Sequence, residues 1–235
     1  MNADRKVAVI AGASGGLGKI LTQQLAGQGT RMLLLGRSKE RLQALLDELS
    51  LPAADHMIST ADLSQPTALG EIAKSAQEKF GQIDILLNLI GGWTGGKTLA
   101  ESSADAIQNM LQQHLWTSFH LVQAFVPYIQ NSPSGRVLVV SSPTATQPGA
   151  KTGPYAVGKA AQEAIILTLA KELAGSQATA NIIQVKAIDS EHKREKDPSG
   201  KYAGWTTPEE IAAAVLYLVS DQSKRINGAR IPLYG

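Results

Sequence analysis

Two side chains that can share a proton stand at helical spacing in the second half of the chain. Tyr155 and Lys159 occupy positions i and i+4, which places both on one face of a helix. A free tyrosine has a pKa of about 10. An ammonium about 4 Å away, at an effective dielectric of about 20, favours its ionisation by about 4 kcal/mol. We therefore expect Tyr155 to give and take protons near neutral pH.

The composition favours one soluble α/β domain over residues 1–235. With 235 residues and 43% hydrophobic content, the chain can bury a large core. Its net charge is only +2, and its basic residues are scattered along the chain, so no nucleic-acid surface is predicted. Cysteine is absent, and no apolar run approaches the about 20 residues that span a bilayer. We expect a cytoplasmic protein with no metal site and no membrane partner.

Apolar, β-rich runs alternate with amphipathic stretches along the chain. The runs predict strands at residues 7–11, 32–35, 56–59, 83–90, 137–140, 181–185 and 230–233. The amphipathic stretches predict helices near residues 17–28, 38–49, 66–80, 102–130, 154–174 and 207–220. Nearly continuous hydrophobicity in the strands means that both of their faces are covered. We therefore predict a doubly wound, mostly parallel seven-stranded sheet with helices on both faces.

A polar run of mixed charge at residues 189–201 is the one break in this composition. We favour a solvated loop for this run. The alternative is a mobile flap that closes over an active site.

A glycine-rich turn follows the first predicted strand and precedes a helix. Its glycines, Gly12, Gly16 and Gly18, allow a tight turn and close approach of the backbone. The helix N-terminus adds unpaired N–H groups and the positive end of a dipole, which suit a pyrophosphate. In a βαβ pattern this turn predicts a dinucleotide site that also includes Ser14 and Leu17.

The same turn also matches the G-x-S-x-G nucleophile elbow of α/β-hydrolases, with Ser14 as the nucleophile. That elbow needs an oxyanion loop from an earlier strand and a histidine later in the chain. The turn follows the very first predicted strand, so no earlier strand exists to supply that loop, and the only late histidine, His192, falls in the charged run. We therefore disfavour a hydrolase.

The end of the second predicted strand bears on the choice of cofactor. An NAD site places an acidic residue there to hold the ribose 2′-hydroxyl. Here Gly36 is followed by Arg37, which leaves room for a 2′-phosphate and supplies a bidentate cation. This pair favours NADP(H), with NAD(H) as the alternative.

Taken together, these motifs resemble those of the short-chain dehydrogenase/reductase family in its single-domain, Rossmann-type form. The resemblance covers nearly the whole chain. Beyond the glycine turn, Asp62 and Leu63 match the segment that borders the adenine. Asn88 and Gly91 match the first and last residues of the family's Asn-Asn-Ala-Gly element. Ser142, Tyr155 and Lys159 fall on the family's catalytic positions.

The resemblance implies hydride transfer between NADP(H) and a small carbonyl or alcohol substrate. Ser142 would orient the carbonyl oxygen, and Tyr155 would protonate it as general acid. Lys159 would lower the pKa of the phenol and hold the nicotinamide ribose. The cofactor supplies the hard chemistry, and the protein supplies position and acid catalysis.

Three departures from the family pattern are visible. His114 stands where an asparagine usually supports a proton relay to the lysine, so it either joins that relay or is a buried imidazole bonded to backbone. The Pro-Gly after the sixth strand is missing, and residues 186–189, Lys-Ala-Ile-Asp, occupy its place. The region beyond is short and charged, so the substrate pocket is open or is capped by residues near Trp93, Lys151 and Trp205. Trp93 either stacks on a planar substrate or packs on its own loop.

These departures motivate one alternative function, a dinucleotide-binding sensor or scaffold without turnover. We favour the enzyme, because a sensor has no chemical need for Ser142 and Tyr155. In the family, the two helices at residues 102–130 and 154–174 also build a dimer interface. A homodimer or homotetramer is therefore expected if their apolar residues are exposed.

Overall fold

Seven parallel strands form one sheet in the order β3-β2-β1-β4-β5-β6-β7. The structure is a computed structural model that describes residues 5–63 and 69–234. The strands are β1 (Val7–Ala11), β2 (Arg31–Gly36), β3 (His56–Thr60), β4 (Ile85–Asn88), β5 (Arg136–Ser141), β6 (Thr179–Gln184) and β7 (Arg230–Pro232). All six pairings between neighbours are parallel, which confirms the predicted Rossmann-type fold class.

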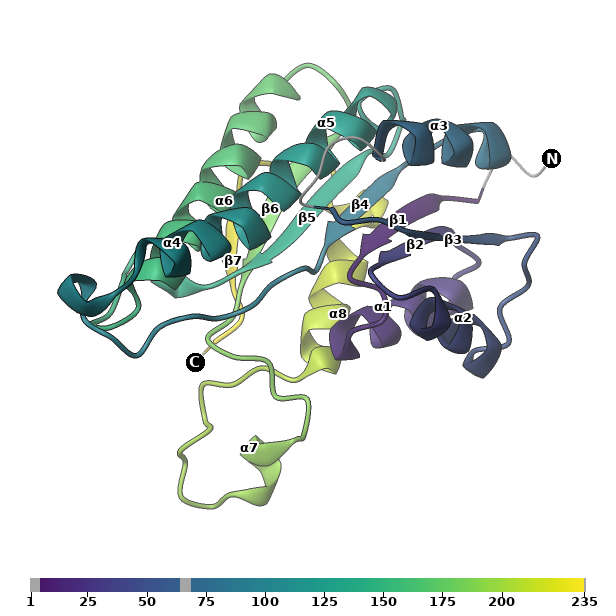
Figure 1. The fold of residues 1–235 in the computed structure, drawn as a ribbon. Coiled ribbons are helices and arrows are strands. Elements are labelled where there is room, and N and C mark those ends of the chain that lie inside the picture. Colours follow the sequence, from purple (N-terminus) through teal and green to yellow (C-terminus); the bar gives the residue numbers. More distant parts are fainter. Residues whose placement is uncertain (1–4, 64–68, 235) are drawn as a thin grey trace.

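Helices cover both faces of the sheet (Figure 1). They are α1 (Gly16–Gly27), α2 (Lys39–Glu48), α3 (Leu69–Phe80), α4 (Ala104–Leu111), α5 (Thr117–Ile129), α6 (Gly153–Glu172), α7 (Lys193–Lys196) and α8 (Pro208–Leu218). The first apolar core joins one face of the strands to α3, α5 and α6, and the second joins the other face to α1, α2 and α8. Strand residues alternate between these two cores, which explains why the strands are apolar on both faces. The predicted start of α3, residues 66–68, lies outside the described residues.

The helix predicted at residues 102–130 is helical without a break from Ala104 to Ile129, and it contains a π-helical turn. A π-helical turn (Gln112–Trp116) separates α4 from α5, and the Thr117 N–H reaches back to the carbonyl of Gln112. The sequence did not predict the π-helical turn, because one extra residue in a turn hardly alters the apolar periodicity. Single π turns inside helices are frequent at functional sites.

The polar run at residues 189–201 is more than a solvated loop. It contains the short helix α7, and the buried carboxylate of Asp189 accepts hydrogen bonds from the N–H groups of Lys193 and Arg194, both at 2.8 Å. Arg194 then pairs with Glu210 in the first turn of α8 at 2.7 Å. Figure 1 shows the segment projecting away from the sheet. The loop prediction is corrected in this respect, and closure over the site stays a prediction.

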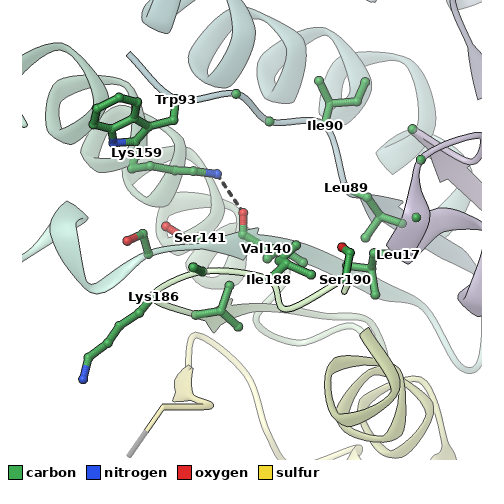
Figure 2. Close-up of a pocket in the computed structure, with 18 of the residues that line it drawn as sticks. Leu17, Leu89, Ile90, Trp93, Val140, Ser141, Lys159, Lys186, Ile188 and Ser190 are labelled. Carbon is green, nitrogen blue, oxygen red and sulfur yellow. Dashed lines mark hydrogen bonds between the residues drawn. The ribbon is translucent and has the colours of Figure 1, made fainter. Parts of the chain in front are cut away.

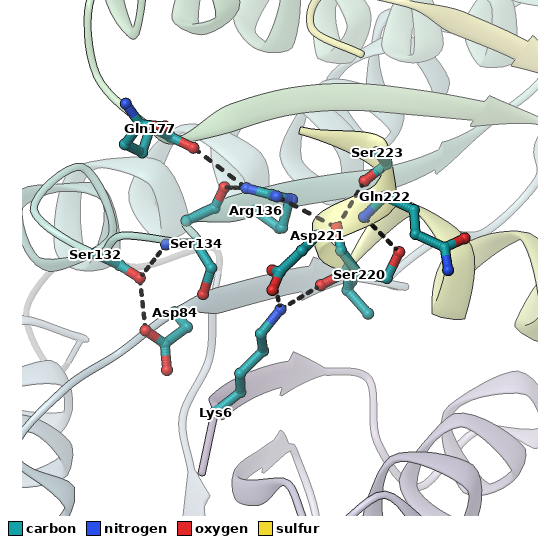
Figure 3. Close-up of polar contacts among 12 residues, drawn as sticks. Lys6, Asp84, Ser132, Ser134, Arg136, Gln177, Ser220, Asp221, Gln222 and Ser223 are labelled. Carbon is teal, nitrogen blue, oxygen red and sulfur yellow. Dashed lines mark hydrogen bonds and ion pairs between the residues drawn. The ribbon is translucent and has the colours of Figure 1, made fainter. Parts of the chain in front are cut away.

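A set of buried polar groups links the amino ends of the strands by hydrogen bonds (Figure 3). Asp84 accepts hydrogen bonds from the Val7 N–H at 2.8 Å and from the Ser132 hydroxyl at 2.6 Å. The guanidinium of Arg136 donates to three carbonyl oxygens, those of Gly135, Gln177 and Ser220. Such contacts satisfy backbone groups that the parallel ladder leaves open.

In the part of the chain that the structure describes, we find no helix with the length and apolarity needed to traverse a lipid bilayer.

Candidate active site

The candidate site is a cavity of about 600 Å³ at the carboxyl edge of the sheet (Figure 2). It opens where the strand order reverses between β1 and β4, whose last residues, Ala11 and Asn88, are paired. Open α/β sheets bind ligands in this crevice, because the loops on either side lead to opposite faces. The walls come from the glycine turn, from the segments that follow β4, β5 and β6, and from α6.

The glycine turn forms one end of this cavity. Gly12 has φ +89°, which a side chain rarely adopts, and a methyl group at Gly18 would collide with the carbonyl oxygens of Gly12 and Ala13. The helix α1 begins at Gly16, and its N-cap residue, Gly15, supplies no capping side chain. The first N–H groups of α1 are therefore left to other partners, and this bare N-terminus fits a pyrophosphate.

Of the residues predicted in this turn, four line the cavity, namely Gly12, Gly16, Leu17 and Gly18. Ser14 does not line it and lies toward the end of β2, with its Oγ 3.5 Å from the position that a Cβ of Gly36 would take. His192 pairs with Glu209 at 3.3 Å. Ser14 and His192 thus belong to different surroundings, and the geometry does not support a hydrolase elbow.

At the other end of the cavity lie Ser142, Tyr155 and Lys159. Ser142 follows β5, is almost fully buried, and accepts a hydrogen bond from the Thr144 N–H at 3.3 Å. Tyr155 lies in the first turn of α6, whose helical path puts Lys159 on the same side one turn later. The structure therefore brings the three residues predicted to be catalytic to one wall.

Lys159 lines the cavity but is almost fully buried. Its Nζ donates to the Val140 carbonyl at 2.8 Å and to Oε1 of Gln162 at 2.9 Å. Burial lowers the pKa of Lys159 to about 7, and the charge of Glu163 opposes that shift. The lysine is thus poised to change charge near neutral pH.

Tyr155 does not have a lowered pKa in this arrangement. Burial raises the pKa of its phenol, and a hydrogen bond with Ser142 acts in the opposite direction. The Nζ of Lys159 lies 6.0 Å from the centre of the phenol ring. That Lys159 lowers the pKa of the Tyr155 phenol therefore stays a prediction. It applies to a state in which the charged lysine lies closer to the phenol oxygen.

His114 lies in the π-helical turn and is completely buried. Its Nε2 is 3.1 Å from the carbonyl oxygen of Gly92, and its ring meets that of Tyr155 edge-on at 5.7 Å. Burial, followed by the charge of Lys159, lowers the pKa of His114 to about 3. The arrangement favours the second alternative, a neutral imidazole bonded to backbone, and Nε2 carries its proton because a carbonyl only accepts.

Asn88 and Gly91 lie on the segment that leaves β4. Asn88 is buried and does not line the cavity, because its amide donates to Ser118 Oγ at 2.9 Å and accepts from the Ile90 N–H at 3.1 Å. It therefore shapes the loop rather than facing a ligand. Gly91 does line the cavity, and beyond it Trp93 lines the wall while 63% exposed.

The three residues predicted for the adenine end lie outside the cavity. Arg37 is exposed just after β2, Asp62 is exposed after β3, and Leu63 is buried in the apolar core. A smaller hollow of about 220 Å³ lies nearby, and it is lined by Lys39, Ile58, Ser59 and Thr60. Because Gly36 is paired with Thr60, this hollow adjoins the end of β2.

Sequence reasoning missed several residues of this region, among them Ser190 and Gln162. Ser190 lines the cavity, and its Oγ is 3.7 Å from the position that a Cβ of Gly16 would take. Figure 2 places it beside Leu17, at the glycine turn. Gln162 contacts Lys159 from behind the wall. Gln162 could have been found from the sequence, because it is a polar residue three positions after Lys159. Nothing in the charged run at residues 189–201 singled out Ser190.

Comparison with known proteins agrees with this geometry. Residues 6–200 match the family model described as short chain dehydrogenase. The chain is 26% identical to the 3-oxoacyl-acyl-carrier-protein reductase FabG of Escherichia coli over 246 residues, which cover 100% of this chain and 98% of the relative.

Solved structures of similar proteins agree with this family match. A short chain dehydrogenase from Bacillus anthracis matches with a TM-score of 0.84 at 27% identity, over 98% of this chain and 95% of the other. A short chain oxidoreductase from Pseudomonas aeruginosa, described as containing an atypical catalytic center, matches in its apo form with a TM-score of 0.88 at 25% identity, over 98% and 96%. Its NADPH-bound form matches with a TM-score of 0.85 at 24% identity, over 97% and 94%. With the sheet order and the cavity described above, these matches show that the chain belongs to the short-chain dehydrogenase/reductase family.

Proposed function

We propose that this oxidoreductase family member interconverts a carbonyl compound and a secondary alcohol with NADP(H). One observation carries the proposal: the glycine turn and the three residues Ser142, Tyr155 and Lys159 face the same cavity. The cavity volume of about 600 Å³ falls in the ordinary range for small-molecule sites. In this proposal, cofactor and catalytic groups share one domain.

The side chains divide the work by their chemistry. Ser142 donates a hydrogen bond to the substrate oxygen and fixes its position. Tyr155 transfers a proton to that oxygen in reduction and removes it in oxidation. Lys159, when charged, stabilises the phenolate and binds the ribose. NADPH, when bound, supplies the hydride.

The glycine turn, with Leu17, would hold the pyrophosphate, and Gly91 with Lys159 would contact the nicotinamide half. Arg37 makes no hydrogen bond or ion pair with the rest of the described chain, so its guanidinium is available for a 2′-phosphate. The NADPH-bound Pseudomonas aeruginosa oxidoreductase shares the fold, which is consistent with this choice. NAD(H) stays the alternative cofactor.

Calorimetric titration with NADPH and NADH tests the cofactor. We expect tighter binding of NADPH, lost in Arg37→Asp and kept in Arg41→Asp, an exposed control on α2. Turnover of a panel of small ketones and 3-oxoacyl thioesters should then be abolished in Tyr155→Phe. The thioesters are included because the Escherichia coli relative is a 3-oxoacyl-acyl-carrier-protein reductase.

The alternative function is a dinucleotide-binding sensor or scaffold. The raised pKa of Tyr155 and the histidine at position 114 favour it, as does the atypical catalytic center of the Pseudomonas relative. NADPH binding without turnover of any carbonyl would support the sensor, and failure to bind either cofactor would reject both proposals.

A homodimer or homotetramer belongs to the same proposal. Trp116, Phe119 and Val157 are 40%, 41% and 42% exposed on the surfaces of the π-helical turn, α5 and α6. Large apolar side chains at this exposure favour burial against another copy. Light scattering should give a mass of two or four chains, reduced in Phe119→Glu. The cytoplasm stays a prediction from the sequence.

A further inference from the structure

A buried chain of polar side chains runs behind Lys159, on the side away from the cavity. Gln162, which is 0% exposed, contacts the lysine Nζ through Oε1 at 2.9 Å and Ser118 Oγ through Nε2 at 3.1 Å. It links the catalytic helix α6 to α5, just past the π-helical turn. A buried amide between two helices is costly unless both of its ends are bonded.

The hydroxyl of Ser118 fixes the direction of every bond in this chain. Its Oγ donates to the carbonyl of His114 at 2.6 Å, which uses its one proton. It therefore accepts from the amides of Asn88, at 2.9 Å, and Gln162. Because Gln162 must present its NH2 group to Ser118, its oxygen faces the lysine.

The protons of the ammonium are then accounted for. A lysine ammonium has three donors. One goes to the Val140 carbonyl at 2.8 Å and one to the Gln162 oxygen, which leaves one. Both contacts are rigid, because Val140 lies within β5 and the amide is held by Ser118.

We propose that Gln162 is a positioning residue for Lys159: its amide oxygen holds the ammonium in its protonated form and directs the remaining proton toward the cavity. This inference rests on the proposed function for its catalytic meaning. An amide does not titrate, so Gln162 positions the charge and does not conduct a proton.

Other charged or titratable groups surround the lysine. Glu163 on α6 is bonded to Arg230 of β7 at 2.6 Å and to Gln184 of β6 at 2.9 Å. The other two titratable groups near the lysine are His114 of the π-helical turn and Tyr155 of α6. Among the described residues, neither of them makes a hydrogen bond with the lysine Nζ. Gln162 is therefore the side chain whose change acts on the ammonium most directly.

The test is an NMR titration of the protein without cofactor, labelled with 13C at lysine. The Cε resonance of Lys159 is assigned by its loss in Lys159→Met, and its midpoint is followed from pH 5 to pH 10. Gln162→Glu puts a carboxylate on the ammonium and should raise the midpoint by about one pH unit or more. Gln162→Leu removes the acceptor and should lower the midpoint.

Opposite shifts in the two variants are the expected result, because a merely structural role would move both midpoints in one direction or neither. Gln123→Glu, at an exposed position of α5, is the matched control and should leave the midpoint within about 0.2 pH units. Equal midpoints in wild type, Gln162→Glu and Gln162→Leu would overturn the inference. If Gln162→Leu does not fold, the Lys159 midpoints of Gln162→Glu and Ser118→Ala still test the inference. Ser118→Ala frees the amide of Gln162 to turn away from the lysine, so a shift of the midpoint is expected in both variants.

NADPH titration of the same proteins separates the two proposals. If wild type binds no NADPH, the proposed function fails, although the lysine titration still tests Gln162. If wild type binds and Gln162→Leu loses more affinity at pH 8.5 than at pH 6, the held charge serves the cofactor. Equal losses at both pH values would contradict that role.

Discussion

Lys159 and Glu163 lie one turn apart on α6, both buried, yet they do not bind each other. The ammonium faces β5 and Gln162, whereas the carboxylate of Glu163 faces Arg230 at 2.6 Å. The positive charge is therefore stabilised by neutral oxygens at contact distance and by a carboxylate only from farther away. This separation explains why burial dominates the pKa of Lys159.

The first prediction concerns the pH dependence of stability. Folding lowers the pKa of Lys159 from 10.5 to about 7, so between these values the unfolded chain binds a proton that the folded chain releases. The cost of burying the charge is complete below pH 7 and is relieved as the pH rises toward 10.5. Lys159→Met should therefore gain stability relative to wild type at pH 6.5 and lose part of that gain by pH 9.

The expected change in this difference is on the order of 2 kcal/mol, since each pH unit corresponds to about 1.4 kcal/mol. Urea unfolding at the two pH values measures it. Lys171→Met, exposed on the same helix, reports the effect of the methionine itself. A difference between Lys159→Met and wild type that does not depend on pH would show that the lysine is not buried with its charge.

The second prediction concerns His114 and acid. Its pKa falls from 6.5 to about 3 on folding, so the folded chain loses stability relative to the unfolded chain as the pH falls through that window. His114→Asn removes this loss, and its disadvantage at pH 7 should shrink by about 2 kcal/mol at pH 5. The pH–rate profile between pH 6 and pH 8 should not show an ionisation that the variant removes. An extra ionisation near pH 6.5, absent in the variant, would instead place the imidazole in a relay.

The sequence was sufficient to predict the parallel sheet, and to predict that the glycine turn and the residues Ser142, Tyr155 and Lys159 lie at one cavity. Both follow from local patterns: apolar strands in a fixed alternation, and motifs at strand ends that the topology must bring together. It was not sufficient for the state of the lysine, because its acceptors come from β5 and from a glutamine whose orientation is set by Ser118 on α5. Such contacts depend on how helices cross, which periodicity does not encode.

The same limit applies to two residues whose predicted role in cofactor binding stays a prediction. Asn88 was expected to bind cofactor, and its amide instead bonds Ser118 and the Ile90 N–H. Leu63 was expected beside an adenine, and it lies in the apolar core. In both cases the side chain does not line the cavity, because its direction depends on the packing of the neighbouring helix.

The third prediction tests the glycine turn. Gly18→Ala forces a methyl group into the carbonyl oxygens of Gly12 and Ala13, which belong to the turn itself. We expect a loss of about 1–3 kcal/mol in stability and loss of NADPH binding in calorimetry. Gly27→Ala is the matched control, because nothing lies within 4 Å of a methyl group at this last residue of α1. It should bind NADPH as wild type does. Normal binding by Gly18→Ala would mean that the turn can relax without touching the site.

The fourth prediction concerns the amino ends of the strands, far from the cavity. Asp84 is 2% exposed and accepts from the Val7 N–H and the Ser132 hydroxyl, so Asp84→Ala leaves two buried donors without partners. Each such donor costs about 1–3 kcal/mol, and urea unfolding should show a loss of about 2–4 kcal/mol. Asp55→Ala breaks a half-exposed ion pair with Arg5 and should cost less than about 1 kcal/mol. NADPH affinity should be unchanged in both variants at temperatures where they are folded. A similar loss from the two substitutions would mean that water reaches Val7 and Ser132 once the carboxylate is gone.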